Sequence, residues 1–290
     1  MLQTLLNGLI QGALFALMAL AFSLVYSTSR VLHVAQGAIY AFAPYALLGA
    51  LHADLGWIFG LIFALGLAVL VGVLCEEVLH WPFLRRGAPP EVHLIGSLGM
   101  YLVLVQIVAL TWGNDVQVLR HEVDTVYQFG DLSLTGAQSI CGVGALATMG
   151  AFFFWLGRTE LGMQFRAMAD NPVLLGLLGR DVRWLRRLVF GVSAALAALA
   201  ALGSAYDTGF DPHGGLNAVL IGIVATIIGG RGSLAGAALA GLLLGIIRSE
   251  VVWFASARWE QAATFLILAL VLFFRPQGLF GRKLRLEEAE

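Results

Sequence analysis

The sequence predicts an all-α polytopic membrane protein with a single transmembrane domain over residues 1–290. Hydrophobic residues make up 59% of the chain and charged residues only 12%, whereas about 25% of the residues in a soluble protein are charged. Apolar runs recur along the whole chain, and each is close to or above the roughly 20 residues that a helix needs to cross a bilayer. The net charge of -1 gives no sign of nucleic-acid binding.

About eight transmembrane segments follow one another. Seven have the length of one helix, and they cover residues 5–25, 31–52, 57–79, 94–112, 136–157, 187–207 and 261–275. The remaining region, 216–248, is too long for one ordinary helix, and glycines interrupt it in the middle. We predict a broken or re-entrant helix pair there, with a turn at Gly230, Arg231 and Gly232. Irregular backbone at this depth is tolerated only where protein or water covers it.

Charged loops predict the orientation of these segments. Arginines gather in the early loops at Arg30 and Arg85, in the segment 158–187 and in the tail 276–290. Loops rich in Lys and Arg stay in the cytoplasm, so we place these parts there. The other loops carry Asp and Glu and face outside, which also places the N-terminus outside.

Catalytic and metal-binding patterns are missing from the chain. A Walker motif needs a lysine, and the chain holds a single one, Lys283, in the tail. If ATP drives transport, another subunit binds it. No ligand spacing indicates a metal site. Carboxylates are scarce inside the spans, which argues against a proton- or sodium-coupled transporter. The adjacent Glu76 and Glu77 are expected to cap a helix or reach the membrane surface.

The segment 158–187 predicts two short cytoplasmic helices with a hinge at Asp170–Asn171. Asn171 is a good N-cap, Pro172 suits the first helical position, and Gly179 suits a helix end. The segment is too polar to span the membrane, yet its second helix is leucine-rich. Such a helix docks either on a partner protein or on the membrane surface, and the residues leave both open.

Four motifs resemble one family in the right order. They are "FRAMADNPVLLGLLGRDV", the N-terminal "NGLIQGALFALMALAFSLVYSTSRVLHVAQGAIYAFAPYALLGA", "GGRGSLAGAALAGLLLG" and "RPQGLFG". Together they are similar to the branched-chain amino acid (LivH-type) permeases of ABC importers, nearly from end to end. His33 and Val34 depart from the asparagine and the aromatic residue of the family pattern.

This resemblance implies an inverted-repeat ABC permease fold in the bacterial inner membrane. It implies a second permease subunit, homologous or identical, two cytoplasmic ATPase subunits that bind ATP and Mg, and a periplasmic substrate-binding protein. The cargo would be branched-chain or related amino acids, or else urea, short amides or aromatic acids. The chain itself would be non-catalytic and bind no cofactor. The residues that would couple it to an ATPase are Arg166, Ala167, Asp170, Asn171, Pro172 and Gly176.

Polar residues inside the second span have two interpretations. His33, Gln36, Gly37 and Tyr40 either line the translocation path or satisfy backbone groups and pin the helix to its neighbours. Interhelical hydrogen bonds in a membrane are worth about 0.6–2 kcal/mol, which is sufficient reason to keep them without any substrate. A stand-alone secondary transporter or channel remains an alternative to the importer subunit.

Overall fold

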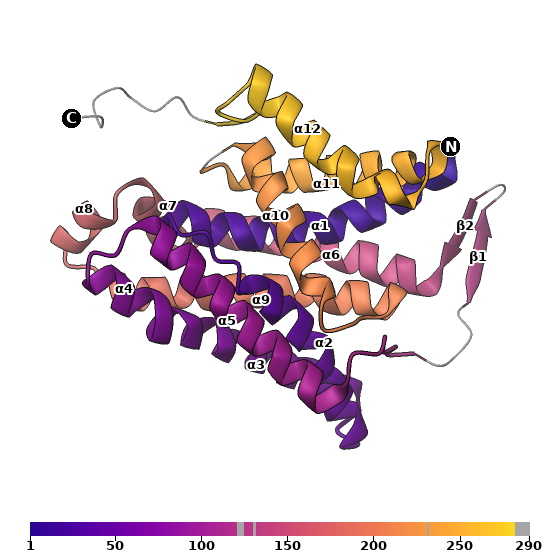
Figure 1. The fold of residues 1–290 in the computed structure, drawn as a ribbon, viewed down its shortest axis with the longest axis horizontal. Coiled ribbons are helices and arrows are strands. Elements are labelled where there is room, and N and C mark those ends of the chain that lie inside the picture. Colours follow the sequence, from indigo (N-terminus) through magenta and orange to yellow (C-terminus); the bar gives the residue numbers. More distant parts are fainter. Residues whose placement is uncertain (121–124, 130–131, 231, 282–290) are drawn as a thin grey trace.

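Long apolar helices dominate the computed structural model, which describes residues 1–120, 125–129, 132–230 and 232–281 (Figure 1). Among these residues, seven helical segments are long and apolar enough to cross a membrane. Two helices lie at the centre, because α1 (Leu2–Ser29) and α9 (Val182–Thr208) bury the largest share of their apolar stretches, 83% and 67%. The prediction of an all-α polytopic membrane protein is confirmed.

Three further elements follow α1 in the first half of the chain. They are α2 (Gln36–His52), α3 (Gly56–Cys75) with its extension through the π-helical turn η1 (Glu76–His80) and α4 (Trp81–Arg85), and α5 (Pro90–Trp112). Residues 31–35 are not helical. Here the second span departs from its predicted start, because the chain turns back into the bundle before α2 begins.

The second half repeats this plan in the opposite direction. After α9 come the short α10 (Gly214–Gly229), then α11 (Leu234–Phe254), the single turn η2 (Ala257–Trp259) and α12 (Glu260–Phe274). Contacts between helices match in pairs: α1 packs on α10 and α11 as α9 packs on α2 and α3, and α2 contacts α5 as α10 contacts α12. The chain therefore has the inverted repeat that its resemblance implied.

The predicted break at 216–248 is confirmed as two helices, α10 and α11. Gly230 and Gly232, which flank the turn, have φ values of 103° and 82°, a backbone conformation that glycine adopts readily. Arg231, predicted at the tip, lies outside the described residues. The amides of Leu279 and Phe280 donate hydrogen bonds to the carbonyls of Ile228 and Gly229, so the chain after α12 caps the end of α10.

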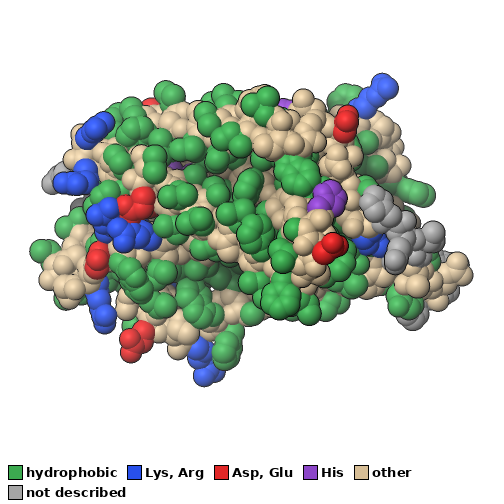
Figure 2. Space-filling view, turned by 90° about the horizontal axis from the view of Figure 1, so that it is seen from below, with side chains coloured by type: hydrophobic (Ala, Val, Ile, Leu, Met, Phe, Trp, Pro, Cys, Tyr) green, Lys and Arg blue, Asp and Glu red, His purple; other side chains and the backbone are tan. Residues whose placement is uncertain are grey.

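The remaining elements lie between the halves and at the two ends of the bundle. After α6 (Gly136–Arg158) come α7 (Glu160–Asp170) and α8 (Pro172–Leu177), at the end opposite to the N-terminus (Figure 1). A small antiparallel hairpin of β1 (Val126–Phe129) and β2 (Leu132–Thr135) lies at the N-terminal end, and no sequence pattern predicted it. Figure 2 shows a largely apolar face, with most blue side chains toward the α7–α8 end.

Candidate functional site

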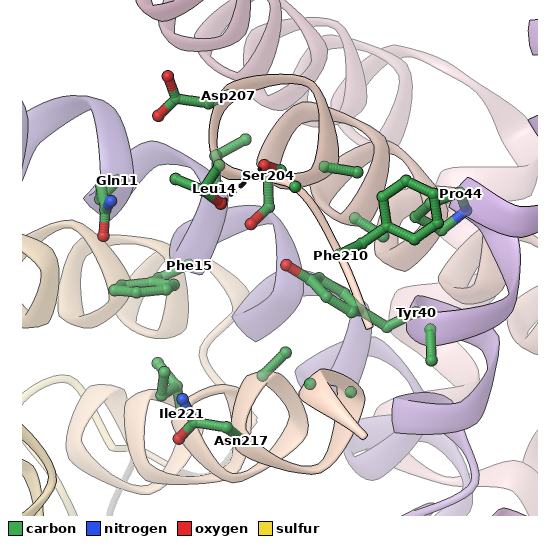
Figure 3. Close-up of a pocket in the computed structure, with 18 of the residues that line it drawn as sticks. Gln11, Leu14, Phe15, Tyr40, Pro44, Ser204, Asp207, Phe210, Asn217 and Ile221 are labelled. Carbon is green, nitrogen blue, oxygen red and sulfur yellow. Dashed lines mark hydrogen bonds between the residues drawn. The ribbon is translucent and has the colours of Figure 1, made fainter. Parts of the chain in front are cut away.

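A cavity of about 260 Å³ lies near the starts of α2 and α10. Helices α1, α2, α9 and α10 supply most of its walls, and α11 and α12 each add one residue. Figure 3 shows the Tyr40 ring reaching toward Ser204, with Gln11 and Asn217 on other sides. The polar lining is mixed with the rings of Phe15 and Phe210. Such a cavity can admit a small polar molecule with an apolar part.

The cavity floor depends on two glycines. Gly37 and Gly215 are the second residues of α2 and α10, and the backbones of the two helices touch there: a Cβ atom at either position would clash with the backbone carbonyl of the other. Gly215 lines the cavity and Gly37 lies against it. This close approach joins the starts of α2 and α10 beside the cavity.

Gln36 is fully buried and lies outside the cavity lining. Its Nε2 donates a hydrogen bond of 2.7 Å to Ser193 Oγ of α9, and Ser193 Oγ donates one of 2.7 Å to the carbonyl of Ala21 in α1. The bonds tie α2 to both central helices. Gln36 Oε1 has no hydrogen-bond partner in the described part of the chain.

His33 lies deeper still, in the stretch between α1 and α2. Its ring packs against Phe190 at 5.1 Å between centroids, and its Nδ1 is 2.9 Å from Nε2 of His80. Of the four predicted path residues, Tyr40 therefore lines the cavity, Gly37 contacts the lining residue Gly215, and Gln36 and His33 lie outside the lining. The assignment of these residues to a translocation path stays a prediction.

An ion pair at the cavity wall was missed by sequence reasoning. Arg248 Nε of α11 donates to Glu260 Oε1 of α12 at 2.8 Å, and Nη1 donates to Thr264 Oγ1 at 3.3 Å. Arg248 and Glu260 both line the cavity, and Arg248 is only 5% exposed. A signal was available, since a lone arginine at the end of an apolar run needs a partner.

A buried carboxylate at the opposite end corrects the expectation for Glu76. Glu76 accepts hydrogen bonds from Arg186 in a buried ion pair, and Glu77 pairs with Arg183 and Arg187. Glu76 therefore neither caps a helix nor reaches the membrane surface, whereas Glu77 is partly exposed. These pairs also explain why α9 begins at Val182, five residues before the predicted 187: its arginines are neutralised by η1 and can belong to the helix.

The two short helices predicted in the segment 158–187 are confirmed as α7 and α8, and their place in the cytoplasm stays a prediction. Asn171 Oδ1 accepts hydrogen bonds from the amides of Val173 and Leu174, and the chain turns after α8 at Gly179, with φ of 80°. Phe165 of α7 is buried in the core. The apolar side chains of α8 differ from Phe165, because all except Leu175 are well exposed. The exposed ones are Val173, Leu174, Leu177 and, directly after the helix, Leu178.

The predicted coupling residues lie around the same two helices. Arg166 and Asp170 line a second cavity of about 340 Å³, which Gly232 and Phe280 also line. Pro172 is the first residue of α8, and Gly176 lies in its last turn, where an added Cβ would meet a methyl group of Val182 at 3.6 Å. The turn between α10 and α11, the chain after α12 and the α7–α8 hinge therefore meet in one place. Their role in coupling stays a prediction.

Residues 4–274 match the family described as "Branched-chain amino acid transport system / permease component". The chain is 29% identical to the permease protein LivH of the high-affinity branched-chain amino acid transport system of Escherichia coli K12, covering 97% of this chain and 96% of LivH. It is 29% identical to BraD of Pseudomonas aeruginosa PAO1 with the same coverage. The autoinducer 2 import permease LsrC of Yersinia pseudotuberculosis is also 29% identical, over 94% of this chain and 77% of LsrC.

The fold has a counterpart among solved structures. A chain of "PsaBC from Streptococcus pneumoniae in complex with Fab" aligns with a TM-score of 0.51 at 13% identity, over 93% of this chain and 91% of that one. At this identity the likeness concerns the fold alone. The family match covers nearly the whole chain, and the apolar helices, the inverted repeat and the short helices α7 and α8 agree with it. The chain therefore belongs to the family of permease components of branched-chain amino acid transport systems, as a non-catalytic, multi-pass membrane protein.

Proposed function

We propose that this chain is the permease subunit of an ABC importer in the bacterial inner membrane, with branched-chain or related amino acids as cargo. It pairs with a second permease subunit, homologous or identical. Two cytoplasmic ATPase subunits bind ATP and Mg, and a periplasmic binding protein delivers the substrate. The names of LivH and BraD support this assignment, since both relatives belong to high-affinity branched-chain amino acid systems.

The exposed apolar face of α8 is the observation that carries the proposal. Leu177 is 80% exposed and Leu178 72%, at the arginine-rich end of the bundle. A short helix held by an Asn171 cap and presenting leucines outward is suited to a groove on another protein. Because α7 is buried against the core beside it, movement of a bound ATPase would be passed through the hinge into the bundle.

The lining of the 260 Å³ cavity supports a small polar cargo. Tyr40, Ser204 and Asn217 offer hydroxyl and amide groups that fit the charged ends of an amino acid, and Phe15 and Phe210 offer apolar surface. Urea, a short amide or an aromatic acid would also find partners there. The relative LsrC is named for autoinducer 2 import, which keeps a cargo other than an amino acid as the second candidate. A stand-alone transporter or channel lacks such an observation.

The coupling surface can be tested by placing a charge on the exposed apolar face of α8. We expect Leu177→Glu to abolish co-purification of the ATPase subunits and to reduce uptake at least tenfold, because a carboxylate on the apolar face must be desolvated on docking. Val116→Glu is the matched control, since Val116 is 69% exposed at the other end of the bundle. Asp170→Lys and Gly176→Trp should also lower substrate-stimulated ATP hydrolysis. Normal uptake in all three α7–α8 variants would remove α8 as the coupling surface.

A further inference from the structure

Three histidines form a buried hydrogen-bonded chain at the inner end of the α2 face. His33 Nδ1 is 2.9 Å from His80 Nε2, and His80 Nδ1 is 3.1 Å from His93 Nδ1. The three side chains come from the stretch before α2, from η1 and from α5, and none is more than 3% exposed. The family match assigns no role to these three histidines, and none of them lines the cavity that contains Tyr40.

Both hydrogen bonds between the three histidines can form when all three imidazoles are neutral. A neutral imidazole has one N–H donor and one acceptor nitrogen. His80 uses both nitrogens, so it donates to one neighbour and accepts from the other. One proton per contact satisfies the two bonds in either direction, and no additional proton is needed.

The surroundings disfavour a charged imidazole. Arg186 acts electrostatically on both His80 and His93, and it has the same sign as an imidazolium. Both carboxylates of η1 are already bound, Glu76 by Arg186 and Glu77 by Arg183 and Arg187. Phe190 covers His33 and His80, and Phe83 packs on the edge of His93. A buried positive charge without a counter-ion is costly.

The histidine chain also holds residues 31–35, the stretch that leads into α2. Ser97 Oγ of α5 accepts a hydrogen bond from the amide of Val34 and can donate to the carbonyl of Leu32. With His33 bound to His80, residues 32–34 are held on two sides. Gln36 and Gly37 follow directly, so any shift of this stretch moves the floor of the cavity.

We propose that the His33–His80–His93 chain is a positioning element for α2, which holds only while its imidazoles are neutral, so that acid on the cytoplasmic side loosens residues 31–35 and slows transport. Histidines in the unfolded chain take up protons near about pH 6.5. The three buried histidines therefore make their full contribution to the stability of the folded protein above that pH, and this contribution is lost as the pH falls. Each proton taken up by the unfolded state alone changes the unfolding equilibrium tenfold per pH unit.

The first test measures unfolding of the purified full-length protein in lipid nanodiscs between pH 7.5 and 5.5. We expect acidification to shift the unfolding equilibrium of the wild type at least tenfold more than that of His80→Gln. His52→Gln is the matched control, since His52 is exposed at the other end of α2, and it should follow the wild type. An acid shift of full size in His80→Gln would overturn the proposal. His33→Asn gives the same comparison if His80→Gln does not fold.

The second test rests on the proposed function and measures uptake by the assembled importer with the pH set on the ATPase side. We expect wild-type and His52→Gln uptake to fall several-fold from pH 7.5 to 5.5, and His33→Asn uptake to change little across this range. If His33→Asn uptake were lower than wild-type uptake by the same factor at every pH, and so fell with acid as steeply as the wild type, the role of His33 would be purely structural and the proposal would be overturned. If no assembly transports at any pH, the proposed function fails, while the unfolding test still decides the histidine chain.

Discussion

The two halves of the inverted repeat follow one plan but are held by different chemistry. In the first half, His80 joins the extension of α3 to His93 near the start of α5. At the corresponding place in the second half, Arg248 joins α11 to Glu260 and Thr264 at the start of α12. One link is neutral and completely buried, whereas the other is ionic, and Glu260 and Arg248 line a cavity.

This difference indicates that the halves respond to different conditions. A chain of neutral imidazoles depends on pH near neutrality, whereas an arginine–carboxylate pair stays charged through that range and responds to water, salt and ligands at the cavity. Symmetric architecture therefore does not require symmetric energetics. The glycine contact on which both halves depend has to be the most sensitive point, and the links specific to one half should be less so.

The largest effect is expected at that shared contact. Gly215→Leu should prevent accumulation of folded protein, because the added Cβ meets the backbone carbonyl of Gly37, which cannot turn aside as a side chain can. Overpacking costs about 1–3 kcal/mol in ordinary cores, and a backbone clash between two helix starts should exceed that. Membrane yield and thermal unfolding measure the effect. Gly99→Leu, at an exposed helical glycine with open space, is the control; equal yields would disprove the contact.

Breaking the ionic link of the second half should have an intermediate effect. Arg248→Leu removes bonds to Glu260 and Thr264, and hydrogen bonds to charged groups contribute about 1.5–3 kcal/mol. Because Glu260 is left without a partner at the cavity wall, uptake should fall together with the melting temperature. Arg258→Leu alters an exposed arginine in η2 and should change neither. A melting curve like that of the wild type would mean that α12 is held by its apolar contacts alone.

The smallest effect is expected from Gln36→Leu, and it separates the two interpretations of that residue. Loss of the bond to Ser193 should lower stability by about 0.6–2 kcal/mol, partly offset because Oε1 is already without a partner among the described residues. Ser193→Ala removes the same bond from the other side and serves as the comparison. If Gln36 belongs to the path, Gln36→Leu alters uptake kinetics and Ser193→Ala does so much less. Equal kinetics in the two variants would favour packing.

Much of the fold was open to prediction because it follows from local properties of the chain. Apolar length located the spans, glycine and proline located the break at 216–248 and the hinge at Asp170–Asn171, and the Asn171 cap set the start of α8. The hairpin of β1 and β2 escaped because two four-residue strands have no lasting pattern. The start of α2 was placed five residues too early because Val31 and Ala35 are as apolar as the helix that follows.

The sequence by itself determined the membrane class, the helical segments, the short helices α7 and α8 and the family, since each depends on residues close together in the chain or on motifs in a fixed order. Only the tertiary structure decided the partners of its buried polar groups. Arg186 met Glu76 across 110 residues and Gln36 met Ser193 across 157. Such pairings arise when helices pack, because a buried charge or amide takes whichever partner the neighbouring helix brings within reach.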